Sequence, residues 1–78
     1  MSDRTVDARG HLCPVPSLKL KKALEAGEAG RWTLLATDQM ARIDVPHLMA
    51  ELGGSVVSID DEDGVLAIAV DWPGAPKD

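Results

Sequence analysis

DARGHLCPVP, residues 7–16, joins a predicted strand to a predicted helix. Residues 4–8 have the alternating pattern of a short strand, and Gly10 marks a turn after it. Pro14 and Pro16 are typical of a helix start, because the first-turn N–H groups that proline lacks have no intrahelical partner in any case. The stretch therefore predicts a strand that passes through a short loop into a helix.

The second predicted helix has the clearest apolar pattern in the chain. Asp44 is predicted as its N-cap, with Pro46 in the first turn and Gly53-Gly54 at its end. Asp38 is expected to cap a shorter turn over residues 39–42. The apolar stripe of this helix, spaced i, i+3, i+4 and i+7, consists of Val45, Leu48, Met49 and Leu52.

Three further strands complete the predicted order β-α-β-α-β-β. They cover residues 32–37, 55–59 and 65–72, and residues 60–64 form a loop between the last two. The first helix is expected to end near Ala26, before a glycine. One face of the last strand is expected to carry Leu66, Ile68, Val70 and Trp72.

This order predicts an α/β fold, a two-layer sandwich with a four-stranded mixed sheet and two helices on one face. The first two strands should be parallel with a right-handed crossover, which places both helices on the same side. Parallel strands also bring both strand-to-helix loops to one edge of the sheet. The loop with Cys13 should therefore lie beside the loop with Thr37 and Asp38, at the edge where α/β folds concentrate their ligand chemistry.

The chain has 78 residues, and we expect one domain over residues 1–78 with a flexible tail at 73–78. Residues 1–7 lack the apolar region of a signal peptide, and no stretch is long enough to span a bilayer. One cysteine excludes an intramolecular disulfide, and Cys/His metal-ligand spacings are absent. The sequence therefore predicts a reduced cytoplasmic protein with neither metal nor cofactor.

Charge is unevenly distributed along the chain, whose formal net charge is −5. Up to Arg42, seven Lys and Arg residues accompany five Asp and Glu, whereas one lysine accompanies eight acids after it. One interpretation is two ordinary solvated surfaces. The other is a basic face around the thiol that docks to a partner protein, formed by Arg9, Lys19, Lys22 and Arg42. The acidic total argues against nucleic-acid binding.

Cys13 is the candidate reactive residue. The positive end of a helix dipole favours thiolate, and so lowers a pKa that is about 8.5 for a free thiol. Asp38 on the neighbouring loop opposes this by like-charge repulsion, so we expect a modest shift. His11 is interpreted as an exposed loop residue in preference to a Cys–His partner, because i and i+2 side chains in an extended segment point apart.

Two motifs contain most of these residues. The first reads Asp7-x-x-Gly10-x-x-Cys13-Pro14-x-Pro16, and the second runs from Asp38 to Asp44-Val45-Pro46. Together they resemble the signatures of the TusA/SirA-type sulfur-carrier family, and the resemblance covers nearly the whole chain. It implies that Cys13 carries sulfur as a persulfide and that the two prolines shape the helix start.

The resemblance also implies partners. A cysteine desulfurase or rhodanese-like protein would donate sulfur to Cys13, and a cysteine of an acceptor protein would receive it. Two departures from the family pattern matter. His11 replaces a commonly apolar residue, and Met49 stands where several members have a second cysteine, so release of sulfur must be intermolecular.

Two other functions stay open at this point. The CPxP segment could be only a structural helix start within a regulatory interaction module. Alternatively, Cys13 could be a redox sensor that is switched by sulfenylation or mixed-disulfide formation. Among sulfur pathways, the sequence does not choose between tRNA thiolation, molybdenum-cofactor sulfuration, sulfur oxidation and thiosulfate handling.

Overall fold

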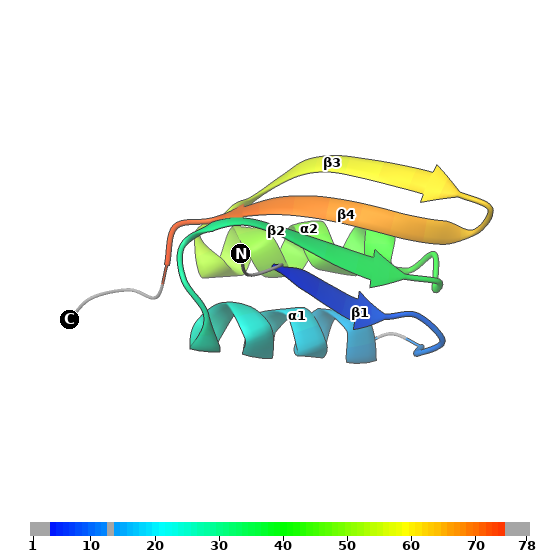
Figure 1. The fold of residues 1–78 in the computed structure, drawn as a ribbon, viewed down its shortest axis with the longest axis horizontal. Helices are drawn as coiled ribbons and strands as arrows, with labels where there is room; N and C mark the ends of the chain where they lie inside the picture. The colour runs from blue at the N-terminus through cyan, green and yellow to red at the C-terminus, as the bar shows by residue number, and fades with distance from the viewer. Residues whose placement is uncertain (1–3, 13, 75–78) are drawn as a thin grey trace.

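Six elements follow one another in the predicted order β-α-β-α-β-β (Figure 1). The structure, a computed structural model, describes residues 4–12 and 14–74. Cys13 and residues 75–78 of the expected tail lie outside the described residues. The elements are β1 (Thr5–Ala8), α1 (Val15–Ala26), β2 (Gly30–Ala36), α2 (Ala41–Leu52), β3 (Ser55–Glu62) and β4 (Val65–Trp72).

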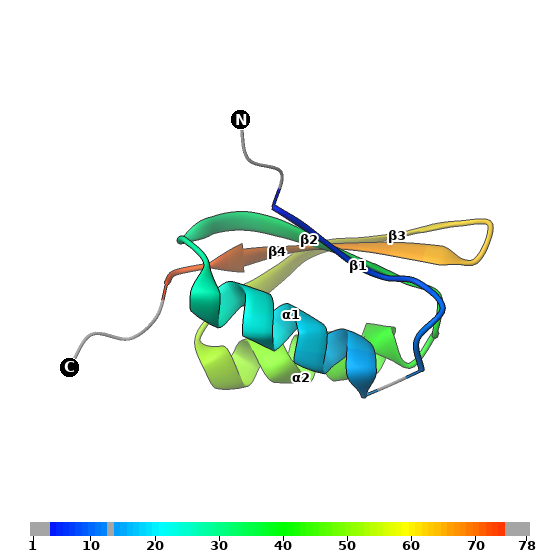
Figure 2. The ribbon, with the colours of Figure 1, turned by 60° about the horizontal axis from the view of Figure 1, so that its bottom comes forward.

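The four strands form one mixed sheet in the order β1-β2-β4-β3. β1 runs parallel to β2, and β4 runs antiparallel to both β2 and β3. Both helices cover the same face of this sheet (Figure 2). The predicted two-layer α/β sandwich is therefore confirmed. No helix within the described ranges is long and apolar enough to cross a membrane.

One apolar core lies between the sheet and the helices. α1 contributes Leu20 and Leu24, both fully buried. The predicted stripe of α2 faces the same core, with Val45 and Met49 buried and Leu48 and Leu52 partly buried. β4 buries the predicted alternate residues Leu66, Ile68, Val70 and Trp72.

α1 starts where the prolines predict. Pro14 is the N-cap residue, with φ −92° and ψ 13°, and Pro16 lies in the first helical turn. Neither ring therefore removes an intrahelical hydrogen bond. The N–H of Val15 donates to the carbonyl of Leu12 (3.0 Å), which closes a turn immediately before the helix. The helix ends at Ala26, as predicted.

α2 begins at Ala41, so the prediction of Asp44 as its N-cap is wrong. Asp38 supplies the contacts before the helix instead: its Oδ1 accepts from the N–H of Met40 (3.0 Å) and its carbonyl from the N–H of Ala41 (3.1 Å). The short turn predicted after Asp38 is thus continuous with the helix. Asp44 lies in the first helical turn, where the dipole favours a carboxylate. Pro46 lies deeper inside the helix than predicted.

β3 and β4 meet in a tighter turn than the predicted loop over residues 60–64. β3 continues to Glu62, which pairs with Val65. Only Asp63 and Gly64 form the turn, with φ values of 54° and 86°. Two-residue hairpin turns of this kind need positive φ at both residues, and Asp-Gly is a preferred pair for it. The acidic residues 60–63 therefore lie mostly on β3, because the tight Asp-Gly turn lets the pairing of β3 with β4 continue to Glu62.

Candidate functional site at the helix starts

Both helices start at the end of the molecule where β1 and β2 finish (Figure 1). The prediction that the two strand-to-helix loops are neighbours is confirmed by a hydrogen bond between them. The N–H of Gly10 donates to Oγ1 of Thr37 (2.9 Å). Gly10 has φ +84°, which favours glycine, so the motif residue makes the turn that presents its N–H to the second loop. The role of Thr37 was not predicted, and its only sequence signal is a hydroxyl immediately after a parallel strand.

Asp7 and Arg9 form a compact ion pair at the start of the first loop. Nε of Arg9 donates to Oδ1 of Asp7 (2.9 Å), Nη2 donates to Oδ2 (2.9 Å), and the backbone N–H of Arg9 donates to Oδ1 (3.1 Å). These hydrogen bonds, with the nearby charges of Arg9 and Lys19, hold the pKa of Asp7 well below its usual range. The motif aspartate therefore stays ionised and fixes the backbone that leads into the loop.

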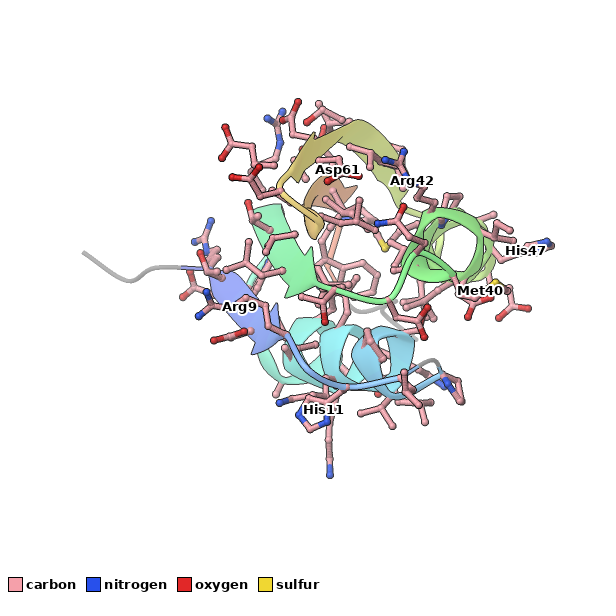
Figure 3. The ribbon with its side chains drawn as sticks, turned by 90° about the vertical axis from the view of Figure 1, so that its right-hand side faces the viewer. Arg9, His11, Met40, Arg42, His47 and Asp61 are labelled. Atoms are coloured by element: carbon pink, nitrogen blue, oxygen red, sulfur yellow. The ribbon has the colours of Figure 1, made fainter. Side chains whose placement is uncertain are left out.

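The predicted basic face is divided by the fold. Lys19 lies near the ion pair, because its Nζ donates to the carbonyl of Asp7 (3.1 Å). Arg42 lies on another side, where its Nη2 donates to Oδ2 of Asp61 (3.1 Å). Figure 3 shows Arg9 near β1 and Arg42 with Asp61 across the end of the molecule. Lys22 is exposed on α1 and forms no ion pair with the described residues. Docking by these four residues stays a prediction.

Cys13 itself lies outside the described residues, but its surroundings in the chain are described. Leu12 and Pro14 are both exposed. His11 is exposed as well, as its interpretation as a loop residue predicts, and its side chain projects beside α1 (Figure 3). The backbone N–H of His11 donates to the carbonyl of Ala8 (3.3 Å). The described parts of the loop therefore lie open to solvent, with their backbone tied to the end of β1.

Sequence reasoning missed a group of exposed apolar side chains at this end. They come from the first loop and the beginnings of both helices, and we call them the helix-start patch: Leu12, Val15, Leu18, Met40 and Ile43. The available signal was that apolar residues fall outside the stripes that face the core. Because these side chains stay exposed, they contribute little to the free energy of folding. Stability of the fold therefore does not explain why they gather at this end.

Other sites are less suited to chemistry. Among the described residues, no group of three or more His, Cys, Asp or Glu side chains could hold a metal ion. A shallow hollow of about 380 Å³ lies far from the helix starts, with Gly53, Gly54 and Trp72 among its lining residues. Its location at the end of α2 separates it from the loop that carries the CPxP motif.

Comparison with known proteins gives a consistent result. The family described as "Sulfurtransferase TusA" matches residues 4–71. A protein of Archaeoglobus fulgidus, named "Putative sulfur carrier protein", is 39% identical over 86% of this chain and 90% of its own length. "Sulfur carrier protein TusA" of Pseudomonas entomophila is 35% identical over 80% of this chain and 79% of its own. The crystal structure of a SirA-like protein from Desulfitobacterium hafniense has a TM-score of 0.74 and 33% identity, covering 86% of this chain and 93% of that one.

Proposed function

The chain belongs to the sulfurtransferase TusA family, and from that premise we propose that Cys13 accepts a sulfane sulfur as a persulfide and passes it to a cysteine of an acceptor protein. The donor is a cysteine desulfurase or a rhodanese-like protein. The relay takes place in the cytoplasm, where thiols are kept reduced.

One observation carries this proposal: Leu12 and Pro14, the chain neighbours of Cys13, are both exposed at the start of α1, at the end where both helices begin. Pro14 and Val15 start the helix immediately after Cys13 in the chain. The positive end of a helix dipole favours thiolate, which is the nucleophilic form of cysteine. Exposed chain neighbours suit a residue that passes sulfur between proteins, because each partner's cysteine must reach the transferred sulfur.

Neither of the two sulfur-transfer steps requires an external oxidant. The Cys13 thiolate attacks the outer sulfur of the donor's persulfide, the donor's S–S bond breaks, and a new S–S bond forms on Cys13. The donor cysteine leaves as a thiolate. In the second step the acceptor thiolate attacks the outer sulfur on Cys13, and the Cys13 thiolate leaves. Both steps are exchanges of one sulfur–sulfur bond for another.

Release within the chain is excluded because Cys13 is the only cysteine. The corresponding position on α2 is Met49, whose side chain is buried in the core. A thioether cannot attack and release a persulfide as a thiolate does. Each cycle therefore requires a second protein or a small thiol as the acceptor.

The test is an intact-mass measurement after incubation with a cysteine desulfurase and cysteine. We expect the mass to rise by one sulfur atom that maps to Cys13, to return after addition of a thiol, and not to rise in Cys13→Ser. Sulfur loading of Cys13→Ser at the parent's level would refute the proposal. Reaction with peroxide but not with persulfide donors would favour the redox sensor.

A further inference from the structure

Exposed apolar side chains are concentrated at one end of this small protein. The described residues include six large apolar side chains with high exposure, and five of them form the helix-start patch. Leu12 is 76% exposed and the other four are between 38% and 58% exposed. The sixth, Val57, is on the edge strand β3. Exposed apolar side chains that gather on one part of a protein's surface commonly mark a contact site.

The patch spans the starts of two helices that lie side by side. Val15 and Leu18 are three residues apart on the exposed side of α1, opposite the buried Leu20 and Leu24. Met40 and Ile43 belong to the start of α2, which lies beside α1 in Figure 2. The core does not use these side chains, because each helix buries a different face.

The charge around the patch differs between its two sides. On α1, Lys19, Lys21 and Lys22 form no ion pair with the described residues, and the helix has no acidic residue before Glu25. On the far side, Arg42 is already paired with a carboxylate on β3. A matching surface therefore needs an apolar centre and carboxylates on the side that meets α1.

We propose that the helix-start patch is the docking surface for the protein partners in sulfur transfer, and that these partners present an apolar centre with an acidic rim towards the lysines of α1. The inference rests on the proposed function of Cys13. Because one small end of the molecule carries both the patch and the CPxP motif, donor and acceptor must occupy it in turn. The carrier therefore leaves its donor before it meets its acceptor.

The experiment separates docking from sulfur chemistry by using two donors. Sulfur loading of Cys13 is measured with a cysteine desulfurase plus cysteine, and separately with inorganic polysulfide, which needs no docking surface. The test variant is Leu18→Gln/Ile43→Gln, since glutamine keeps helix propensity. The matched control is Val57→Gln, which changes a side chain of similar exposure (45%) outside the patch.

We expect the double variant to lose about tenfold or more in kcat/KM for loading from the desulfurase, as truncation of central interface residues typically does. Loading from polysulfide should stay unchanged, and the control should match the parent with both donors. Lys21→Glu/Lys22→Glu should slow loading from the desulfurase most at low salt, because screening weakens the charge effect. A rhodanese replaces the desulfurase in a second series.

The outcomes distinguish this inference from the proposed function. Normal loading of Leu18→Gln/Ile43→Gln from both protein donors, or an equal loss in Val57→Gln, would overturn the docking surface while leaving the carrier function intact. If the parent gains no sulfur from any donor, the carrier function fails. In that case the binding of the two donor proteins is measured for Cys13→Ser with and without Leu18→Gln/Ile43→Gln. If neither protein binds, or if the patch substitutions leave binding unchanged, the docking surface is overturned. If binding is lost only with the patch substitutions, the docking surface is supported.

Discussion

At the residue scale, the first motif is explained largely by backbone geometry. Gly10 adopts a positive φ and donates its N–H to Thr37, so it joins the two loops at the site. Nothing lies within 4 Å of where a Cβ would be at Gly10. The requirement for glycine is therefore conformational, and not a matter of space. Asp7 complements it by binding Arg9 through both carboxylate oxygens immediately before this turn.

Gly10→Ala should lower the free energy of unfolding by about 1–2 kcal/mol, the usual cost of placing an L-residue in the left-handed region. Gly10→Asn should cost less, because asparagine tolerates that region better. Urea denaturation of the three proteins measures the difference. An alanine variant as stable as the parent would contradict the conformational explanation, and equal losses in both variants would point to steric contact instead.

The carboxyl group of Asp7 should titrate below the usual aspartate range in the folded protein, because Arg9 stabilises its ionised form. Since the folded pKa is lowered, the ion pair's contribution to stability is present above the unfolded pKa, which is near 3.8, and is lost as the pH falls below it. Carboxyl ¹³C NMR titration measures this directly. Arg9→Gln should return the pKa towards the usual value, and a normal Asp7 pKa in the parent would contradict the pairing.

At the element scale, the sequence predicts which helices and strands exist better than where they begin. The start of α1 is predicted well because proline restricts the backbone locally. The start of α2 is not, because Asp38 and Asp44 both look like suitable caps in the sequence, whereas the N-cap residue is Met40, whose N–H donates to the side chain of Asp38. The end of β3 is also missed, since acidic residues look like a loop until an Asp-Gly turn lets strand pairing continue.

Asp38→Ala should therefore destabilise the protein by about 1 kcal/mol, because the N–H of Met40 loses its acceptor. Asp44→Ala removes only a favourable charge from the first turn of α2, and should cost about 0.3–1 kcal/mol at low salt. Urea denaturation at low and high ionic strength separates the two effects. Salt should reduce the cost of Asp44→Ala and leave that of Asp38→Ala largely unchanged. A larger, salt-independent loss in Asp44→Ala would restore it as the cap.

At the scale of the whole molecule, topology explains the location of the site, and side-chain packing explains its surface. The pairing of β1 with β2 and the two crossovers bring both loops to one end, as the predicted element order requires. The sequence shows the apolar character of that end only as apolar residues outside the core-facing stripes, and periodicity alone does not show that these residues gather at one end. The pairing of Arg42 is not predictable from the sequence either. The sequence suggests that its charge is free to meet a partner protein, but in the fold Arg42 forms an ion pair with Asp61.

Two leucines on α1 provide the sharpest test of this division between core and surface. Leu24 is fully buried and Leu18 is 58% exposed, although both lie on the same helix. Leu24→Ala should cost about 2–5 kcal/mol by leaving a cavity, which is most of the stability that so small a core supplies. Leu18→Ala should change stability by less than about 0.5 kcal/mol. Urea denaturation followed by tryptophan fluorescence measures both, since Trp72 is buried and Trp32 partly so. Similar losses of unfolding free energy in the two variants would mean that Leu18 belongs to the core. Leu18 would then no longer be evidence for a docking surface.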